Sequence, residues 1–204
     1  MIRSVYCTFA LAFSLAACGQ GNQADTNGGS TAATGNDLNV AQDNGATAAN
    51  TAAQPANLQP AVLRTADGQE AGTVSVRQAG SDVVLTVTAT NLPQGERGMH
   101  IHTAGRCEGP TFESAGGHWN PGSKQHGKLN PAGAHRGDMD NLVVGADGRG
   151  TATVTLAGAS LSGGDGSILD ADGASLMIHQ GPDDYRTDPS GDSGSRIACA
   201  VLGG

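Results

Sequence analysis

Short runs of β-branched and aliphatic residues alternate with polar ones along the chain from residue 58 onward. The run at 73–77, Thr-Val-Ser-Val-Arg, has the period of two that places one face of a strand in a core. Gly, Asp and Pro turns such as Asp67-Gly68 separate the runs. The expected strands are 61–65, 73–77, 83–88, 99–102, 141–144, 151–156, 175–179 and 196–202. No helical period persists, so residues 58–204 are predicted to form one all-β domain, an antiparallel sandwich or barrel.

Two segments are too long to be hairpin turns. They span residues 103–140 and 180–195, and the longer one is rich in glycine. Irregular segments of this length inside a compact domain are usually functional. A metal ion or a disulfide would fix them in place, and the chain offers residues for both.

The first 57 residues predict export and a tether. A basic start at Arg3 and an apolar run at 5–17 are typical of a signal peptide, and the run is too short to span a bilayer. Leu15-Ala16-Ala17-Cys18 resembles the lipobox of bacterial lipoproteins, which implies a signal peptide of residues 1–17 and a lipid on Cys18. The alternative is an ordinary secretory signal with an incidental cysteine. Residues 18–57, which lack Lys, Arg and aromatic residues, are expected to form a disordered linker.

Composition narrows the class of protein further. Of 204 residues, 32 are glycine and only 15% are charged, which excludes a coiled coil and disfavours a helical bundle. The net charge of −8 leaves no broad basic surface for nucleic acid. Two of the four cysteines are accounted for by the N-terminal segment, Cys7 within the signal and Cys18 at its end. In an exported, oxidising compartment the other two, Cys107 and Cys199, are expected to form a disulfide.

A His-x-His pair lies on one expected strand. His100 and His102 point to the same face, Ile101 points to the other, and His179 ends a second strand. Taken alone, such a pair is more often solvated or packed in a core than bound to a metal.

Further histidines within 103–140 change this balance. His118, His126 and His135, with Asp138 three residues later, fit a closed tetrahedral zinc site. All six histidines of the chain then fall into two candidate metal clusters. Imidazole is also a ligand for copper.

Six motifs occur in an order that resembles one known family. They are GMHIHTAGRC, SAGGHWNP, KQHG, AHRGDMDN, LMIHQGPDD and GSRIACAVLGG. They resemble the copper/zinc superoxide dismutases, and the likeness covers residues 58–204. It implies an eight-stranded antiparallel Greek-key β-barrel, or immunoglobulin-like sandwich, with a zinc and disulfide loop and a second, active-site loop. The implied activity is conversion of superoxide to O₂ and H₂O₂ with one copper and one zinc per subunit.

The resemblance also implies roles for single residues. Copper would be held by His100, His102, His118 and His179. Zinc would be held by His118, His126, His135 and Asp138. His118 would bridge the two metals and take part in proton transfer, and Asp183 would join His100 to His126 through hydrogen bonds. Arg196 would bind the superoxide anion, and Cys107 and Cys199 match the family disulfide.

A non-catalytic alternative is an exported copper-buffering or copper-delivery module on the same fold, and a third is a structural lipoprotein. The complete ligand set and Arg196 favour the enzyme. Arg196 could otherwise be a surface ion-pair partner. The segment 180–195 has Arg186 as its only base among four aspartates, so Lys124, Lys128 and Arg136 are the candidates for attracting the anion.

The expected surroundings of the protein follow from these features. It would face the periplasm or cell envelope and contact membrane through the N-terminal lipid only. Superoxide is the expected substrate, nucleic acid is not expected as a partner, and the chain could be a monomer or a homodimer.

Overall fold

A computed structural model describes residues 57–164 and 166–203. The expected signal peptide, the lipidated Cys18 and all of the expected linker except residue 57 lie outside the described residues. Within the described part, no helix is both long and apolar enough to cross a membrane.

The described residues form nine strands and a single turn of 3₁₀ helix, η1. The strands are β1 (Ala61–Thr65), β2 (Glu70–Ala79), β3 (Asp82–Ala89), β4 (Gly95–Arg97), β5 (Met99–His102), β6 (Leu142–Val144), β7 (Gly150–Leu156), β8 (Ala174–His179) and β9 (Arg196–Leu202), and η1 is Glu113–Ala115. Seven strands form one curled sheet in the order β5-β8-β9-β1-β2-β3-β7, and β4 pairs with β6. Every paired strand is antiparallel, which confirms the expected fold class.

One strand was not expected from the sequence. The eight expected runs correspond to eight strands, and β4 is the additional one. Its three residues, Gly-Glu-Arg, follow a turn and offer no apolar alternation, so the pattern indicates only a turn there. β4 forms because residues 95–97 pair with residues 142–144 of β6, a contact remote in sequence.

The inner face of the sheet carries the core. Val83, Leu85 and Val87 share one face of β3, and all three are fully buried. Met99 and Ile101 of β5 and Leu176 and Ile178 of β8 belong to the same buried cluster. Burial of such aliphatic side chains contributes about 1.5–3 kcal/mol each, which holds the strands rigidly.

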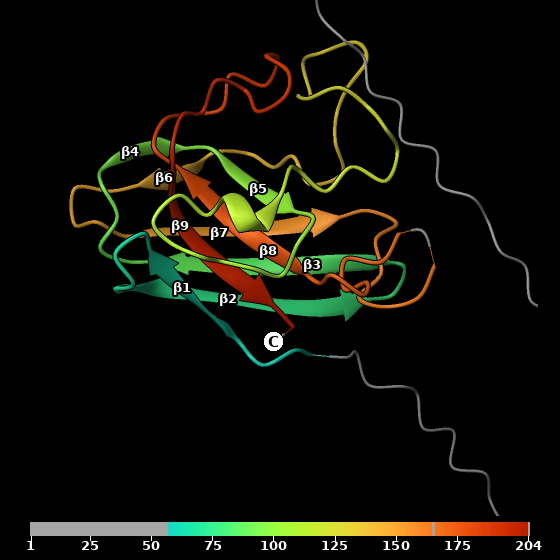
Figure 1. Ribbon diagram of the computed structural model, residues 1–204, viewed down its shortest axis with the longest axis horizontal. Coiled ribbons are helices and arrows are strands. Elements are labelled where there is room, and N and C mark those ends of the chain that lie inside the picture. The colour runs from blue at the N-terminus through green and yellow to red at the C-terminus, as the bar shows by residue number, and fades with distance from the viewer. Residues whose placement is uncertain (1–56, 165, 204) are drawn as a thin grey trace, which may run out of the picture. The chain divides into compact units, whose positions relative to one another are not determined.

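Strands β5 and β8 are buried on both faces, unlike β2 and β3. Their inner residues face the core, and the two long loops, 103–141 and 180–195, cover the outer side. In Figure 1 the first part of the 103–141 loop crosses in front of β8 and β9, and the rest lies beside the 180–195 loop at the top of the view. The outer face of β5 presents His100 and His102, so the loops enclose histidines that would otherwise lie on the surface.

Candidate metal centre

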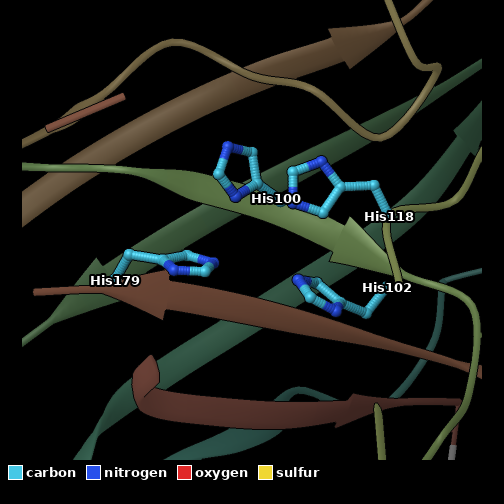
Figure 2. A group of neighbouring side chains, drawn as sticks. All are labelled: His100, His102, His118 and His179. Atoms are coloured by element: carbon cyan, nitrogen blue, oxygen red, sulfur yellow. The ribbon is translucent and has the colours of Figure 1, made fainter. Parts of the chain in front are cut away.

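Four histidines from three parts of the chain converge above the outer face of the sheet. His100 and His102 come from β5, and His179 ends β8. His118 belongs to the 103–141 loop, where its backbone pairs with that of His102 as an isolated antiparallel β-bridge. Their rings point toward a common space (Figure 2). One nitrogen from each ring lies within 4.8 Å of the others. The pair expected on one strand thus joins two histidines from remote segments, and the four together form the first cluster.

In three of these rings, the nitrogen that points away from the common space, called here the outer nitrogen, forms a hydrogen bond with the protein. His102 Nδ1 donates to the Gly116 carbonyl (2.9 Å), and His179 Nδ1 donates to the Gly194 carbonyl (3.0 Å). His100 Nε2 donates to Asp183 Oδ2 (2.7 Å). Each bond fixes the ring and its tautomer, so the opposite nitrogen keeps a free lone pair.

Those opposite nitrogens fit a metal ion. His100 Nδ1 and the Nε2 atoms of His102, His118 and His179 are buried, and among the described residues they have no hydrogen-bond partner. Leaving a buried polar atom unpaired costs about 1–3 kcal/mol. Four such atoms facing one space are therefore better explained by a ligand than by packing, and an all-imidazole set suits copper.

A second cluster is centred on Asp138. Its Oδ1 lies 2.9 Å from His118 Nδ1, and 3.1 Å from the Nδ1 atoms of both His126 and His135. His118 Nδ1 and His135 Nδ1 are 3.3 Å apart. Donor atoms about 2.0 Å from a tetrahedral zinc ion are about 3.3 Å from each other, so this set has the right size for zinc.

His118 belongs to both clusters. Its Nδ1 faces Asp138, and its Nε2 is one of the unpaired atoms of the first cluster. Its ring is stacked on that of His100, with centroids 4.0 Å apart. The geometry therefore permits one imidazole to serve two ions.

Asp183 links the two clusters from behind. Its Oδ2 accepts the hydrogen bond from His100 Nε2, and its Oδ1 accepts one from His126 Nε2 (3.0 Å). Both rings then turn their Nδ1 atoms toward the clusters. Gly191, at φ +66°, packs against Asp183 and His126 so closely that a methyl group there would clash with the carboxylate.

Burial controls the charge of the first cluster. It lowers the pKa of His100 to about 3, of His102 to about 2 and of His179 to about 4, against an ordinary value of 6.5. The pKa of His118 is also lowered by burial. These rings are neutral at pH 7, the state required of a metal ligand.

The second cluster is more polar. Burial alone would lower the pKa of His126, but the adjacent carboxylates of Asp138 (3.1 Å) and Asp183 (3.0 Å) outweigh it and raise that pKa to about 9. Burial opposes ionisation of both aspartates as well. Their histidine and backbone partners nevertheless hold the carboxyl pKa values well below the usual range. Both aspartates are therefore anionic at pH 7 and can balance the charge of a bound cation.

Arg196 lies at the mouth of the first cluster. It lines a cavity of about 390 Å³ together with His102, His118 and His179. Its guanidinium donates to the carbonyls of Phe112 (2.6 Å) and Gly116 (2.8 Å). Burial lowers the pKa of Arg196, but a guanidinium stays charged at neutral pH. Among the described residues it forms no ion pair, and the acidic group whose charge acts on its pKa is Glu113.

The expected disulfide is confirmed. Cys107 and Cys199 are bonded, with Cα atoms 5.7 Å apart. The bond ties the start of the 103–141 loop to β9, beside the buried side chains of Phe112 and Met177. The same segment supplies both carbonyls that hold Arg196.

Two basic residues of the long loop, Lys128 and Arg136, have local partners. Lys128 pairs with Asp140 and lies over the Tyr185 ring, and Arg136 lies over the ring of Trp119. Trp119 itself is packed in the core. Arg196 is thus the basic side chain that lines the cavity of the first cluster.

Sequence reasoning missed several residues that support the site. The carbonyls of Gly116 and Gly194 leave no signal, because any residue type offers a carbonyl. Asn141 exchanges two hydrogen bonds with the backbone of Asp183, and Asp188 accepts one from the backbone of His126. An asparagine at the start of an expected strand and one of four aspartates in a loop are both common features, so neither could be recognised as functional from the sequence.

The fold and the two clusters define a class of protein, a Greek-key β-barrel with two adjoining histidine-rich clusters that have His118 in common. The family model described as copper/zinc superoxide dismutase (SODC) matches residues 70–202, and the chain belongs to this family.

Individual relatives agree with this membership. The chain is 42% identical over 139 residues to superoxide dismutase (Cu-Zn) 1 of Aquifex aeolicus, a match covering 66% of this chain and 81% of that one. It is 40% identical over 145 residues to the superoxide dismutase (Cu-Zn) of Caulobacter vibrioides, covering 70% and 83%. The crystal structure of a superoxide dismutase-like protein from Bacillus subtilis superimposes with a TM-score of 0.68 at 40% identity, covering 72% and 100%.

Proposed function

We propose that this protein is an enzyme that dismutates superoxide, with copper in the first cluster and zinc in the second. The observation that carries the proposal is His118, whose two ring nitrogens face different clusters. A copper-buffering module needs neither a shared ring nor a cationic side chain at the mouth of the site.

The residues assigned to each ion follow from the free donor atoms. His100 Nδ1 and the Nε2 atoms of His102, His118 and His179 would hold copper. The Nδ1 atoms of His118, His126 and His135 and Oδ1 of Asp138 would hold zinc. When bound, copper supplies the one-electron chemistry that turns two superoxide anions and two protons into O₂ and H₂O₂, whereas zinc has no redox chemistry of its own.

The protein's own groups bind the substrate and place the proton. Arg196 offers a fixed cation in the cavity, held by two carbonyls so that its remaining N–H groups can meet a small anion. When it is not bound to copper, His118 Nε2 borders the same space and can hold a proton there. Asp183 and the carbonyls of Gly116 and Gly194 keep the other rings in their required tautomers.

We also propose that the protein is exported to the cell envelope and anchored by a lipid on Cys18. The Leu-Ala-Ala-Cys sequence supports this, and a disulfide suits an oxidising compartment. Detergent phase partition of the protein expressed in bacteria tests the anchor. The natural chain should enter the detergent phase and Cys18→Ser should remain in the aqueous phase; equal partition of both would contradict the anchor.

The enzymatic activity is tested on purified protein loaded with both metals. Superoxide should disappear at a rate far above that of buffer and of the metal-free protein, and His118→Gln should lose most of this rate. A fully loaded protein with no rate above buffer would contradict the enzyme and leave the buffering role.

A further inference from the structure

Asp188, in the 180–195 loop, reaches across to the zinc cluster. Its Oδ1 accepts a hydrogen bond from the backbone N–H of His126 at 2.6 Å. The same oxygen lies 3.9 Å from His135 Nε2. One carboxylate thus faces two of the residues that we assign to zinc, although it is not itself directed into the cluster.

His135 differs from the other histidines in how its outer nitrogen is supported. The outer nitrogens of His100 and His126 bond to Asp183, and those of His102 and His179 bond to backbone carbonyls. Among the described residues, His135 Nε2 forms no such bond, and the group it faces is the Asp188 carboxylate.

The position of the proton on the His135 ring explains how Asp188 can act on it. Its Nδ1 lies 3.1 Å from Asp138 Oδ1, inside the cluster. If Nδ1 binds zinc, the ring's proton must be on Nε2, where it points toward the side of Asp188. An anion there favours that tautomer and makes Nδ1 a stronger donor, as carboxylates behind metal-binding histidines generally do.

We propose that Asp188 is a positioning residue for the zinc site, which holds His126 through its backbone and His135 through its ring. The inference rests on the proposed zinc site. It makes Asp188 a second carboxylate of the 180–195 loop, beside Asp183, that supports a histidine of the zinc cluster. Asp188 is about half exposed, its side chain at 47%, so solvent weakens but does not abolish the charge contact.

Two substitutions separate the two contacts. Asp188→Asn keeps an oxygen for the His126 N–H but removes the negative charge that faces His135. Asp188→Ala removes both. Asp192→Asn is the matched control, because it makes the same change of charge in the same loop at an exposed residue whose side chain forms no hydrogen bond or ion pair with either cluster.

The readout is zinc affinity of the full protein, measured by competition with a chromophoric chelator. We expect Asp188→Asn to weaken zinc binding about tenfold and Asp188→Ala by up to about a hundredfold, the range found for such outer partners. Asp192→Asn should bind zinc as the natural chain does. Cobalt placed in the zinc site should show an altered visible spectrum in Asp188→Asn, whereas the paramagnetic resonance spectrum of bound copper should be unchanged.

Other results overturn the proposal. Natural affinity in Asp188→Asn would eliminate the role toward His135, even if Asp188→Ala bound zinc weakly. Equal weakening of copper and zinc, or of Asp192→Asn, would mean a general disturbance of the loop. Failure of the natural chain to bind zinc at all would instead contradict the proposed function.

Discussion

At the scale of the residue, function depends on which ring nitrogen the protein occupies. His102 gives Nδ1 to a carbonyl and keeps Nε2, whereas His100 gives Nε2 to Asp183 and keeps Nδ1. The same type of side chain thus offers a different ring nitrogen to a metal ion at each position, and the hydrogen bond on the other nitrogen decides which one. The orientation of the Arg196 guanidinium is fixed in the same way, because two backbone carbonyls accept hydrogen bonds from this otherwise flexible group.

Arg196→Ala should lower kcat/KM for superoxide by about ten- to a hundredfold, the equivalent of losing one hydrogen bond to a charged group. Arg196→Lys should fall between, because an ammonium keeps the charge but not the planar fork. Stopped-flow measurement of superoxide decay, with metal content determined in parallel, checks this. An Arg196→Ala protein with full metal content and an unchanged rate would exclude Arg196 from substrate binding.

At the scale of the element, the disulfide joins β9 to the loop that carries His118. It closes a separation of 92 residues, which the chain-entropy estimate equates to about 4.6 kcal/mol. Replacing Cys107 and Cys199 together with serine should therefore lower the urea midpoint of the metal-free protein markedly. It should also lower activity, because the segment that holds Arg196 is freed. An unchanged midpoint would show that packing around Phe112 alone fixes this segment.

At the scale of the whole molecule, the buried histidines make the metal-free protein sensitive to acid. In the folded state the pKa values of His100, His102 and His179 lie at about 4 or below, whereas unfolded histidine titrates near 6.5. Below pH 6.5 the unfolded chain takes up protons that the folded chain refuses, so stability falls toward pH 4. His126, with its raised pKa, adds stability as the pH falls from about 9 to 6.5, and this contribution stays constant below pH 6.5.

Melting of the chelator-treated protein measures this sensitivity. The melting temperature should decrease steadily between pH 6.5 and pH 4, and a His179→Gln variant should show a shallower decrease. A melting temperature that stays level across this interval would contradict neutral burial of these rings.

Much of this molecule could be predicted from the sequence because its main signals are local. The period of two in β2 and β3 predicts strands, and the spacing of His100 and His102 places both on one face, away from Ile101. Features that depend on contacts between segments remote in sequence could not be predicted in this way. β4 exists through its pairing with β6, and the carbonyls of Gly116 and Gly194 bear no residue-specific mark. That His118 belongs to both clusters was predicted from the family resemblance and not from the spacing of the histidines.

The central claim is that His118 is shared between the two metal sites, and paramagnetic resonance tests it most directly. Copper(II) is loaded into both sites of the purified protein, and the signal is compared with that of the form with copper in one site and zinc in the other. Two copper ions on one imidazole ring should couple magnetically, so the signal should fall well below that of two isolated ions. A full signal from both ions, with metal content confirming two per chain, would contradict the shared ring.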